Sequence, residues 1–370
     1  MNKDCKIELI NEGNTDIFVF KNKESKKGPG TKDKLPFYNP SMELNRDLSV
    51  LLCQKQINSS ERKLELVDGL ASTGIRGLRF ANELTGDFNI TINDWNPQAF
   101  ELINKNVDNL KIENINSTNI NLNTLLSQKK FDYIDIDPFG SPAYFIDSAM
   151  RSIKNNGIIA CTATDTAALC GTYKKACMRR YSSVPFHSIV MKEIGIRILL
   201  GFICRTAGIY EKALSPIISY STDHYFRVYL KILKGATKAN QSIKNYKMIS
   251  SGEFVGIQKT KEDIGPLWMG KLQDKGTIED LIQILFEKKL NTKNELLRLL
   301  DLLKGESNAS DFFYTTEGIS SKLKKSPPKL EIVLKKLKDK GYHVYKTHFS
   351  QTGFKTNAPI NEIEKVFNKK

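Results

Sequence analysis

Residues 137–140 read Asp-Pro-Phe-Gly and directly follow an apolar run at residues 131–136 that predicts a buried strand. The carboxylate of Asp137 can accept a hydrogen bond from an amine, and Pro138 stiffens the chain beside it. The ring of Phe139 can stack on a flat base. This combination is typical of enzymes that methylate a planar NH₂ group. On its own it is equally consistent with a simple strand end, because Asp-Pro often stops a strand.

A loop with three glycines lies between a predicted strand at residues 64–68 and a predicted helix at residues 78–84. Glycines in such a loop let the backbone approach a ligand closely, and the start of a helix presents free N–H groups. The loop is neither GxGxxG nor a P-loop, so we do not expect it to bind a pyrophosphate. A nucleoside without phosphates, such as S-adenosyl-L-methionine, fits this pattern better.

Asp94 ends a second predicted strand at residues 89–93, and another helix follows. A carboxylate in this position accepts hydrogen bonds from both hydroxyls of a ribose. It lies about 20 residues after the glycine loop, the spacing of a doubly wound nucleoside site. The strand before Asp137 brings that residue to the same carboxyl edge of the sheet. A strand at residues 157–162 and an apolar helix around residues 194–204 continue the alternation, which predicts an α/β fold with a Rossmann-like sheet.

Upstream of this core, residues 42–53 predict an amphipathic helix that carries the charged triplet Asn-Arg-Asp at residues 45–47. Such a triplet is usually the solvated side of its helix. Alternatively, Arg46 reaches the carboxylate of the cofactor, because a guanidinium binds a carboxylate through two parallel hydrogen bonds. Phe37, just before this helix, is either a packing ring or, together with Phe139, one half of a sandwich around a base.

The net charge indicates a polyanionic partner. The chain of 370 residues has 56 lysines and arginines against 41 acidic residues, a formal net charge of +15. A positive field concentrates polyanions, of which nucleic acid is the commonest. The excess gathers in clusters at residues 21–27, 174–180 and 322–340. Clustering favours contact with phosphates over a merely lysine-rich surface.

The remaining composition is that of an ordinary globular protein. No apolar stretch is long enough to span a membrane, and the start of the chain does not resemble a signal peptide. The 6 cysteines show no metal-ligand spacing, and several lie inside apolar runs. We therefore expect reduced thiols in the core of a cytoplasmic protein.

Residues 234–261 lose periodicity and are interpreted as a linker with short strands. Beyond it we expect two amphipathic helices, at residues 278–288 and 293–303. A helix pair at residues 315–323 and 328–338 and a strand at residues 342–345 should follow. This order is a winged-helix pattern whose second helix is rich in lysine; it is either purely structural or grips an RNA backbone. We expect Ser326 to cap that helix and Gly341 to end it. His343 and His348 are interpreted as surface or RNA-contacting residues rather than metal ligands.

Blocks of sequence in a fixed order connect these features to a known family, namely residues 37–47, 68–77, 135–142, 161–171, 265–270 and 346–359. On these blocks the chain resembles the archaeal and eukaryotic tRNA guanine-N2-dimethyltransferases over nearly its whole length. The resemblance implies a Rossmann-like class I S-adenosylmethionine-dependent methyltransferase domain with an N-terminal extension over residues 1–235. It implies a smaller α+β, tRNA-binding domain with a winged-helix-like part over residues 236–370.

The resemblance also implies the reaction. The partner is tRNA, the methyl donor is S-adenosyl-L-methionine, and one or two methyl groups go to N2 of guanine 26, at the junction of the D stem and the anticodon stem. The cofactor contacts of the family map onto Arg46, Arg76 and Asp94. The next cofactor position of the family is an Asp-Ala pair, which here reads Asn121-Leu122. An amide can still accept and donate hydrogen bonds, so an altered adenine contact is expected there.

Several further expectations follow from the resemblance. Some relatives carry a four-cysteine zinc site in the linker, but this chain has no cysteine after Cys204, so we expect no structural zinc. We also expect the protein to act as a monomer. Two other functions stay open: an amino-methyltransferase acting on adenine in DNA or ribosomal RNA, and a non-catalytic RNA-binding protein of the same fold. Intact Arg46, Asp94 and Asp137 argue against the non-catalytic alternative.

Overall fold

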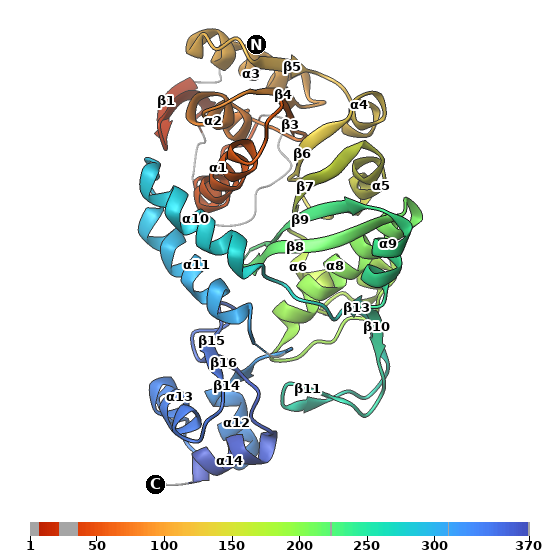
Figure 1. Ribbon diagram of the computed structural model, residues 1–370, viewed down its shortest axis with the longest axis vertical. Coiled ribbons are helices and arrows are strands. Elements are labelled where there is room, and N and C mark those ends of the chain that lie inside the picture. Colours follow the sequence, from red (N-terminus) through yellow and green to blue (C-terminus); the bar gives the residue numbers. More distant parts are fainter. Residues whose placement is uncertain (1–6, 22–35, 223, 310, 369–370) are drawn as a thin grey trace.

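The structure is a computed structural model in which residues 7–21, 36–222, 224–309 and 311–368 are described. A large α/β body occupies one end of an elongated molecule, and a small helix-and-strand unit occupies the other (Figure 1). Except for Lys21, the basic cluster at residues 21–27 lies outside the described residues, as does Cys5.

A seven-stranded sheet forms the centre of the body, in the strand order β5-β4-β3-β6-β7-β9-β8. The strands β5, β4, β3, β6 and β7 pair in parallel, whereas β9 pairs antiparallel with both β7 and β8. The strands are β3 (Leu64–Asp68), β4 (Phe88–Asn93), β5 (Ile115–Thr118), β6 (Phe131–Ile136), β7 (Ile153–Ala163), β8 (Lys212–Ser221) and β9 (Phe226–Lys234). The predicted strands at residues 64–68, 89–93, 131–136 and 157–162 are confirmed.

Helices cover both faces of this sheet (Figure 1), and a hydrophobic cluster lies on each face. One face is covered mainly by α4 (Leu122–Gln128), α5 (Ala143–Ser152) and α8 (Met191–Ile209). The other carries α1 (Glu43–Asn58), α2 (Ile75–Glu83) and α3 (Pro97–Leu110). Shorter elements are the hairpin β1 (Ile7–Glu12) and β2 (Thr15–Phe20), the 3-10 turn η1 (Pro40–Met42), and the helices α6 (Thr166–Leu169) and α7 (Lys174–Tyr181).

The helix α1 corrects one expectation. The sequence favoured an amphipathic helix whose charged triplet is solvated, with contact of Arg46 to the cofactor as the alternative, yet every residue from 45 to 54 is buried. The physical reason is that two helices from the second half of the chain, α10 (Lys275–Glu287) and α11 (Lys293–Glu306), pack on the side of α1 that would otherwise face solvent. The triplet at residues 45–47 therefore lies inside the protein and needs partners there.

The segment interpreted as a linker is more ordered than expected. It holds the helix α9 (Ala236–Ile243) and the short strands β10 (Tyr246–Ile249), β11 (Phe254–Val255) and β12 (Gln258–Lys259). The strand β10 pairs with β13 (Ile264–Trp268), and both pack against α8. Because α9 also packs on the edge strand β8, these elements extend the body rather than merely connecting it to the C-terminal unit.

The C-terminal unit has the predicted winged-helix order and a hydrophobic cluster of its own. Its elements are β14 (Tyr314–Thr315), α12 (Thr316–Leu323), α13 (Leu330–Asp339), β15 (Val344–Lys346), β16 (Gly353–Thr356) and α14 (Ile360–Asn368), with the strand order β14-β16-β15. Ser326 is not the cap of the second helix, since α13 begins after Lys329 without a side-chain cap. Gly341 follows the end of that helix with φ +85°, as predicted.

His348 is not a surface residue, which corrects another expectation. Its side chain is 2% exposed, and Nδ1 lies 2.7 Å from Oε1 of Glu306 in α11. Its Nε2 accepts a hydrogen bond from the backbone N–H of Ser221, at the end of β8 (3.2 Å). Because Nε2 accepts a hydrogen bond, the ring proton lies on Nδ1, which donates a hydrogen bond to Glu306. His348 thus ties the C-terminal unit to the body, whereas His343 is exposed as expected.

The described part of the chain can be compared with the expectations for the cysteines and for membrane-spanning segments. Cys53, Cys161, Cys170, Cys177 and Cys204 are all free and buried, as predicted. Within the described ranges, none of the helices combines the length and apolar character needed to cross a membrane.

Candidate active site at the carboxyl edge of the sheet

Three parallel strands end side by side, and the loops after them carry the predicted site residues. Asn93, the last residue of β4, donates from Nδ2 to the carbonyls of Gly69 (3.0 Å) and Ile120 (3.1 Å). One amide therefore joins the loop after β3 to the loop after β5. Gly69 has no space for a side chain, because a Cβ there would lie 2.7 Å from Leu122 and 2.9 Å from the carbonyl of Asp135.

Asp94 sits at this junction, immediately after β4. Its Oδ2 accepts the backbone N–H of Ser72 (2.7 Å), and its Oδ1 accepts that of Asn96 (2.9 Å). Burial raises the pKa of Asp94, although these two hydrogen bonds act in the opposite direction. The carboxylate is thus fixed against the glycine loop, and each oxygen keeps a further lone pair for another donor.

Phe37 belongs to the same group of loops through its backbone. The Oγ of Ser72 accepts the N–H of Phe37 (2.9 Å) and donates to its carbonyl (3.0 Å). Ser72 has φ +51°, an uncommon backbone conformation for a residue with a side chain. Sequence reasoning did not single out Ser72, which links Phe37 to Asp94.

Asp137, after β6, is held by Arg76 from the start of α2. The Nη2 of Arg76 donates to Oδ2 of Asp137 at 2.6 Å, and the Asp137 side chain is 23% exposed. The Nη1 of Arg76 donates to Oδ1 of Asn45 and to Oγ of Ser49, both at 2.8 Å and both in α1. Arg76 is thereby enclosed by protein groups, while Asp137 reaches the surface.

A buried ion pair lies behind this contact. Asp135, in β6, is fully buried and accepts both terminal nitrogens of Arg227 from β9, at 3.1 and 2.6 Å. Its Oδ1 also lies 3.3 Å from Nε of Arg76. Burial disfavours the charged carboxylate, but the charges of Arg227 and Arg76 outweigh it and lower the pKa of Asp135. Neither Asp135 nor Arg227 was predicted as part of the site.

Arg46 forms an ion pair with Glu12 of the N-terminal hairpin. Its Nε and Nη2 bind the two carboxylate oxygens of Glu12 at 2.6 and 2.5 Å. Glu12 also pairs with Arg79 (2.9 Å) and accepts the hydroxyl of Tyr38 (2.8 Å). Burial opposes the ionisation of Glu12, but the two arginines outweigh it and lower its pKa to about 2. The guanidinium of Arg46 thus binds the carboxylate of Glu12 in β1, and its predicted contact with the carboxylate of the cofactor stays a prediction.

The turn that carries Phe139 is fixed by β7. The N–H of Gly140 donates to Oγ1 of Thr164 (2.6 Å), and the N–H of Thr164 donates back to the carbonyl of Gly140 (3.0 Å). Gly140 has φ +92°, which favours glycine, and a Cβ there would meet no atom within 4 Å. Phe139 is 50% exposed, so its ring is available to a ligand.

Asn121 and Leu122 stand at the start of α4. The Oδ1 of Asn121 accepts the N–H of Asn123 (2.9 Å) and so caps the helix, and Asn121 itself is exposed. Leu122 is buried against Gly69. The structure therefore brings Asp94, Asp137, Phe139 and the start of α4 to one edge of the sheet.

The family of N2,N2-dimethylguanosine tRNA methyltransferases matches residues 20–368 of this chain. The chain belongs to this family.

Curated relatives named tRNA (guanine(26)-N(2))-dimethyltransferase are close in sequence and length. Those from Methanobrevibacter smithii and Methanocaldococcus jannaschii are each 38% identical, over 98% and 91% of this chain and 97% and 94% of theirs. The solved structure of Trm1 from Pyrococcus horikoshii with S-adenosyl-L-methionine is 33% identical and matches with a TM-score of 0.85, over 97% of this chain and 99% of that one. These comparisons confirm the predicted family and its Rossmann-like class I methyltransferase fold.

In this member of the methyltransferase family, two features of the site were missed by sequence reasoning. Asn45 has a buried Nδ2 that finds no acceptor among the described residues, although its Oδ1 binds Arg76. Trp95 and Tyr144, which follow Asp94 and begin α5, are both 71% exposed. A free donor and exposed rings at one sheet edge fit a ligand that has both an acceptor group and a flat surface.

Metal ligands do not gather in the described part of the chain, where no group of three or more His, Cys, Asp or Glu side chains is positioned to hold an ion. The expected lack of a structural zinc stays a prediction.

Proposed function

We propose that this chain transfers one or two methyl groups from S-adenosyl-L-methionine to N2 of guanine 26 in tRNA. The curated relatives that match nearly the full chain bear the name of this activity. The observation that carries the proposal is the Arg76–Asp137 contact. It engages Oδ2 of Asp137 and leaves Oδ1 without a hydrogen bond among the described residues, at a partly exposed position.

Asp137 acts as the acceptor for the target amine. Bound S-adenosyl-L-methionine supplies a sulfonium methyl that is already a strong electrophile, so the chain mainly has to align guanine N2 with it. The lone pair of N2 is delocalised into the base. Oδ1 of Asp137 accepts one N2–H, and a nearby backbone carbonyl accepts the other, which turns the lone pair toward the methyl. The N2–methyl bond would form as the methyl–sulfur bond breaks, and Oδ1 of Asp137 would take the proton that N2 then loses. Pro138 keeps that backbone stiff.

Phe139 and Phe37 hold the base after it leaves the tRNA stack. The half-exposed ring of Phe139 supports this role, as does the bonding of Phe37 to the Asp94 loop through Ser72. The open space beside Gly140 supports dimethylation, because N2 with one methyl needs room for a second. Ser141 is the other small neighbour to which we assign this role.

The cofactor lies over the glycine loop. Asp94 would bind the ribose hydroxyls of the cofactor, and Asn121 and Leu122 would contact its adenine. The tight loop at Gly69 and the free Nδ2 of Asn45 fit a phosphate-free nucleoside that carries a carboxylate.

Arg46 and Arg76 have different surroundings, so their relation to the cofactor differs. Arg46 reaches the cofactor only beside or in place of Glu12, which now occupies its guanidinium. Arg76 is surrounded by Asn45, Ser49, Asp135 and Asp137. For Arg76 we therefore favour a positioning role through Asp137, with contact to the cofactor as the alternative.

The remaining expectations belong to this proposal. The chain divides into the methyltransferase domain of residues 1–235 and a tRNA-binding domain of residues 236–370, and it acts as a monomer in the cytoplasm. Buried free thiols support a reducing compartment.

The test is a methyl-transfer assay with purified protein, S-adenosyl-L-methionine and unmodified tRNA, followed by mass analysis of the nucleosides. A second tRNA carries adenine at position 26, and the variant Asp137→Asn is compared with Asp147→Asn, an exposed aspartate of α5. We expect dimethylguanosine from the first tRNA only, and a loss of about 10²–10⁴-fold for Asp137→Asn alone.

Other outcomes would change the assignment. Monomethylguanosine alone would keep the class of reaction and withdraw dimethylation. Product from the adenine tRNA, or from DNA or ribosomal RNA, would favour an adenine amino-methyltransferase. Absence of any product together with absence of cofactor binding would favour a non-catalytic RNA-binding protein.

A further inference from the structure

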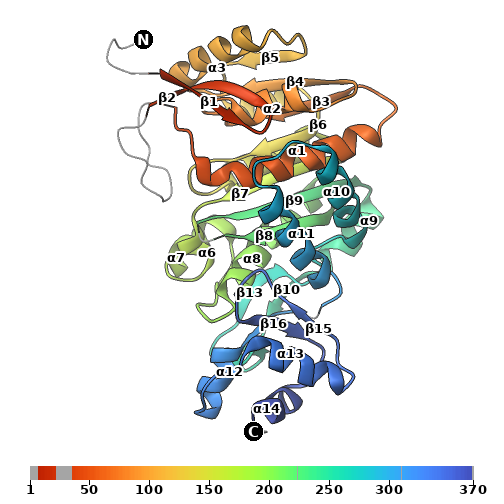
Figure 2. The ribbon, with the colours of Figure 1, turned by 90° about the vertical axis from the view of Figure 1, so that its left-hand side faces the viewer.

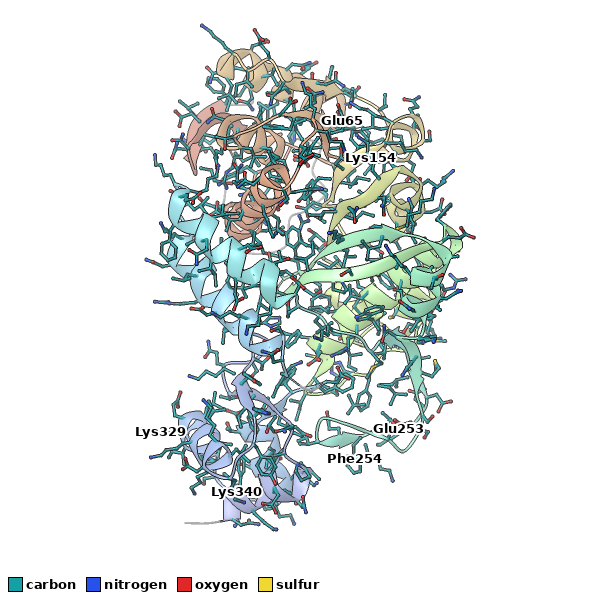
Figure 3. The ribbon with its side chains drawn as sticks, viewed as in Figure 1. Glu65, Lys154, Glu253, Phe254, Lys329 and Lys340 are labelled. Carbon is teal, nitrogen blue, oxygen red and sulfur yellow. The ribbon has the colours of Figure 1, made fainter. Side chains whose placement is uncertain are left out.

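The hairpin β11–β12 presents an aromatic ring to solvent on the side of the molecule that faces the C-terminal unit. Phe254 is 63% exposed, and Figure 3 shows it at the outer edge of this hairpin. It lies directly opposite Lys259 in the hairpin register, so both side chains are on the same face. The Nζ of Lys322, in α12, lies 6.0 Å from the centre of the ring. Phe254 is therefore an exposed ring with Lys322 beside it and Lys259 on the same face of the hairpin.

The hairpin is firmly held, so this exposure is a built feature. The residue next to Phe254, Val255, is fully buried in the main cluster. A Cβ at Gly256 would lie 3.0 Å from the carbonyl of Phe313. The side chain of Gln258 accepts the backbone N–H of Ile189 at 2.9 Å. Because side chains alternate along a strand, burying Val255 holds Phe254 out in solvent.

Hydrogen bonds and ion pairs connect the hairpin to the active site through α7. The turn at Gly140 is bonded to Thr164, and the neighbouring Asp165 pairs with Arg180 of α7 (3.0 Å). At its other end, α7 reaches the hairpin region through an ion pair between Lys174 and Glu262. In Figure 2, α6, α7 and α12 follow one margin of the molecule.

The helix α12 closes this surface. A Cβ at Gly318 would lie 2.8 Å from Ile189 and 2.9 Å from Ile257, so α12 touches both the loop before α8 and the tip of the hairpin. We call the exposed face formed by α7, the hairpin β11–β12 and α12 the hairpin face.

The hairpin face carries several exposed cations. Four of its side chains are exposed and have no ion pair within the described ranges: Lys175, Arg179, Lys259 and Lys261. Lys322 pairs with Glu364 (2.8 Å). Of the nearby acids, Glu253 accepts the backbone N–H of Ser250 (3.1 Å) and Asp263 that of Ser251 (2.7 Å). These two acids and the exposed Glu317 of α12 keep their negative charges, so the face carries charges of both signs, and its four unpaired cations are available to a polyanion.

We propose that the hairpin face binds the tRNA backbone and stacks one unpaired base on Phe254. The inference rests on the proposed function, from which it takes tRNA as the partner. Cations that follow the backbone, combined with an aromatic platform, are the means by which proteins hold single-stranded nucleic acid. The sequence had pointed to the cluster at residues 174–180, part of which lies on this face, and to the lysines around α13, of which Figure 3 shows Lys329 on the far side of the C-terminal unit from Phe254.

The first experiment measures binding of unmodified tRNA to Phe254→Ala without cofactor, by fluorescence anisotropy. The matched control is Phe286→Ala in α10, whose ring is 59% exposed and has Lys293 at 5.1 Å. We expect Phe254→Ala to raise the Kd about five- to twentyfold, the lower part of the range for a stacked base, and Phe286→Ala to leave it unchanged. Phe254→Trp should restore binding.

A second variant, Lys259→Ala, removes an exposed cation without an ion pair among the described residues and should reduce the slope of log K against log salt by about 1. In methylation assays, Phe254→Ala should raise KM for tRNA and leave kcat unchanged, because Phe254 is not part of the catalytic machinery. Equal Kd values for Phe254→Ala and wild type would overturn the proposal. A change in oligomeric state on substitution would also overturn it, because this face would then be a contact between copies of the chain. If the wild type forms no methylguanosine, the proposed function fails, yet the comparison of Kd values still decides this inference.

Discussion

Replacing Arg76 by lysine should slow methyl transfer while leaving cofactor affinity nearly unchanged. The guanidinium spans Oδ2 of Asp137 (2.6 Å) and Oδ1 of Asp135 (3.3 Å), and its Nη1 binds Asn45 and Ser49. Lysine keeps the charge but has a single nitrogen on a flexible stem, so it cannot hold all these acceptors at once. Asp137 then loses its fixed orientation, although its carboxylate remains.

The size of the effect follows from the contact that is lost. A hydrogen bond between charged groups contributes about 1.5–3 kcal/mol. If all of it orients Asp137 in the transition state, kcat falls roughly 10- to 150-fold. Asp137→Asn alone should cost about 10²–10⁴-fold. Because Arg76 acts through Asp137, the double variant should be about as slow as Asp137→Asn.

The assay combines kcat at saturating substrates with calorimetric binding of S-adenosyl-L-methionine for the two single variants and the double variant. Arg197→Lys serves as the control, since Arg197 is also buried in an ion-pair network, with Glu193 and Asp311. Thermal melting checks that each variant is folded. Multiplicative losses in the double variant, together with weaker cofactor binding by Arg76→Lys, would refute the positioning role and assign Arg76 to the cofactor.

Three other perturbations test separate contacts. Glu12→Gln should lower the free energy of unfolding by about 3 kcal/mol at neutral pH. Since the pKa of Glu12 is lowered to about 2, this contribution to stability is complete above about pH 4.5 and disappears as the pH falls toward 2. Urea titrations at pH 7 and pH 3 measure it, and Glu8→Gln at an exposed position is the control. Gly140→Ala should cost about 1 kcal/mol because of its φ of +92°, and nucleoside analysis should show a higher ratio of mono- to dimethylguanosine; an unchanged ratio would remove Gly140 from the methyl pocket. Ser72→Ala removes two hydrogen bonds to Phe37 and should raise KM for tRNA about fivefold in steady-state assays, whereas a change in kcat alone would count against a role in holding the base.

The arrangement of the candidate site was predictable where local rules apply. Strand periodicity, the glycine loop and the acid after the second strand placed Asp94 and Asp137 at one edge, because parallel strands end together. Helical periodicity and the helix end at Gly341 located the winged-helix order, although the cap predicted at Ser326 was wrong. These signals depend on residues close together in the sequence, so a single chain is enough to read them.

The partners of those residues were not predictable. The charged triplet at residues 45–47 was interpreted as solvated, because nothing local shows that α10 and α11 cover α1. Glu12 lies in a segment without a motif, yet it occupies Arg46. Likewise, His348 finds Glu306 and Ser221 at distant positions of the chain. Burial by remote elements decides each case, and periodicity within one helix or strand cannot report it.

The network behind Asp137 shows why its motif is a weak indicator in isolation. Asp137 lies on a loop, and a loop residue keeps a fixed direction only if rigid elements hold it. Here Arg76 joins it to α1, α2 and β6, and Asp135 extends the connection to Arg227 in β9. Two carboxylates face two guanidiniums, so the charges balance where desolvation would otherwise be costly. An Asp-Pro-Phe sequence can end any strand; a carboxylate held in this way, with one oxygen free, can hold an amine.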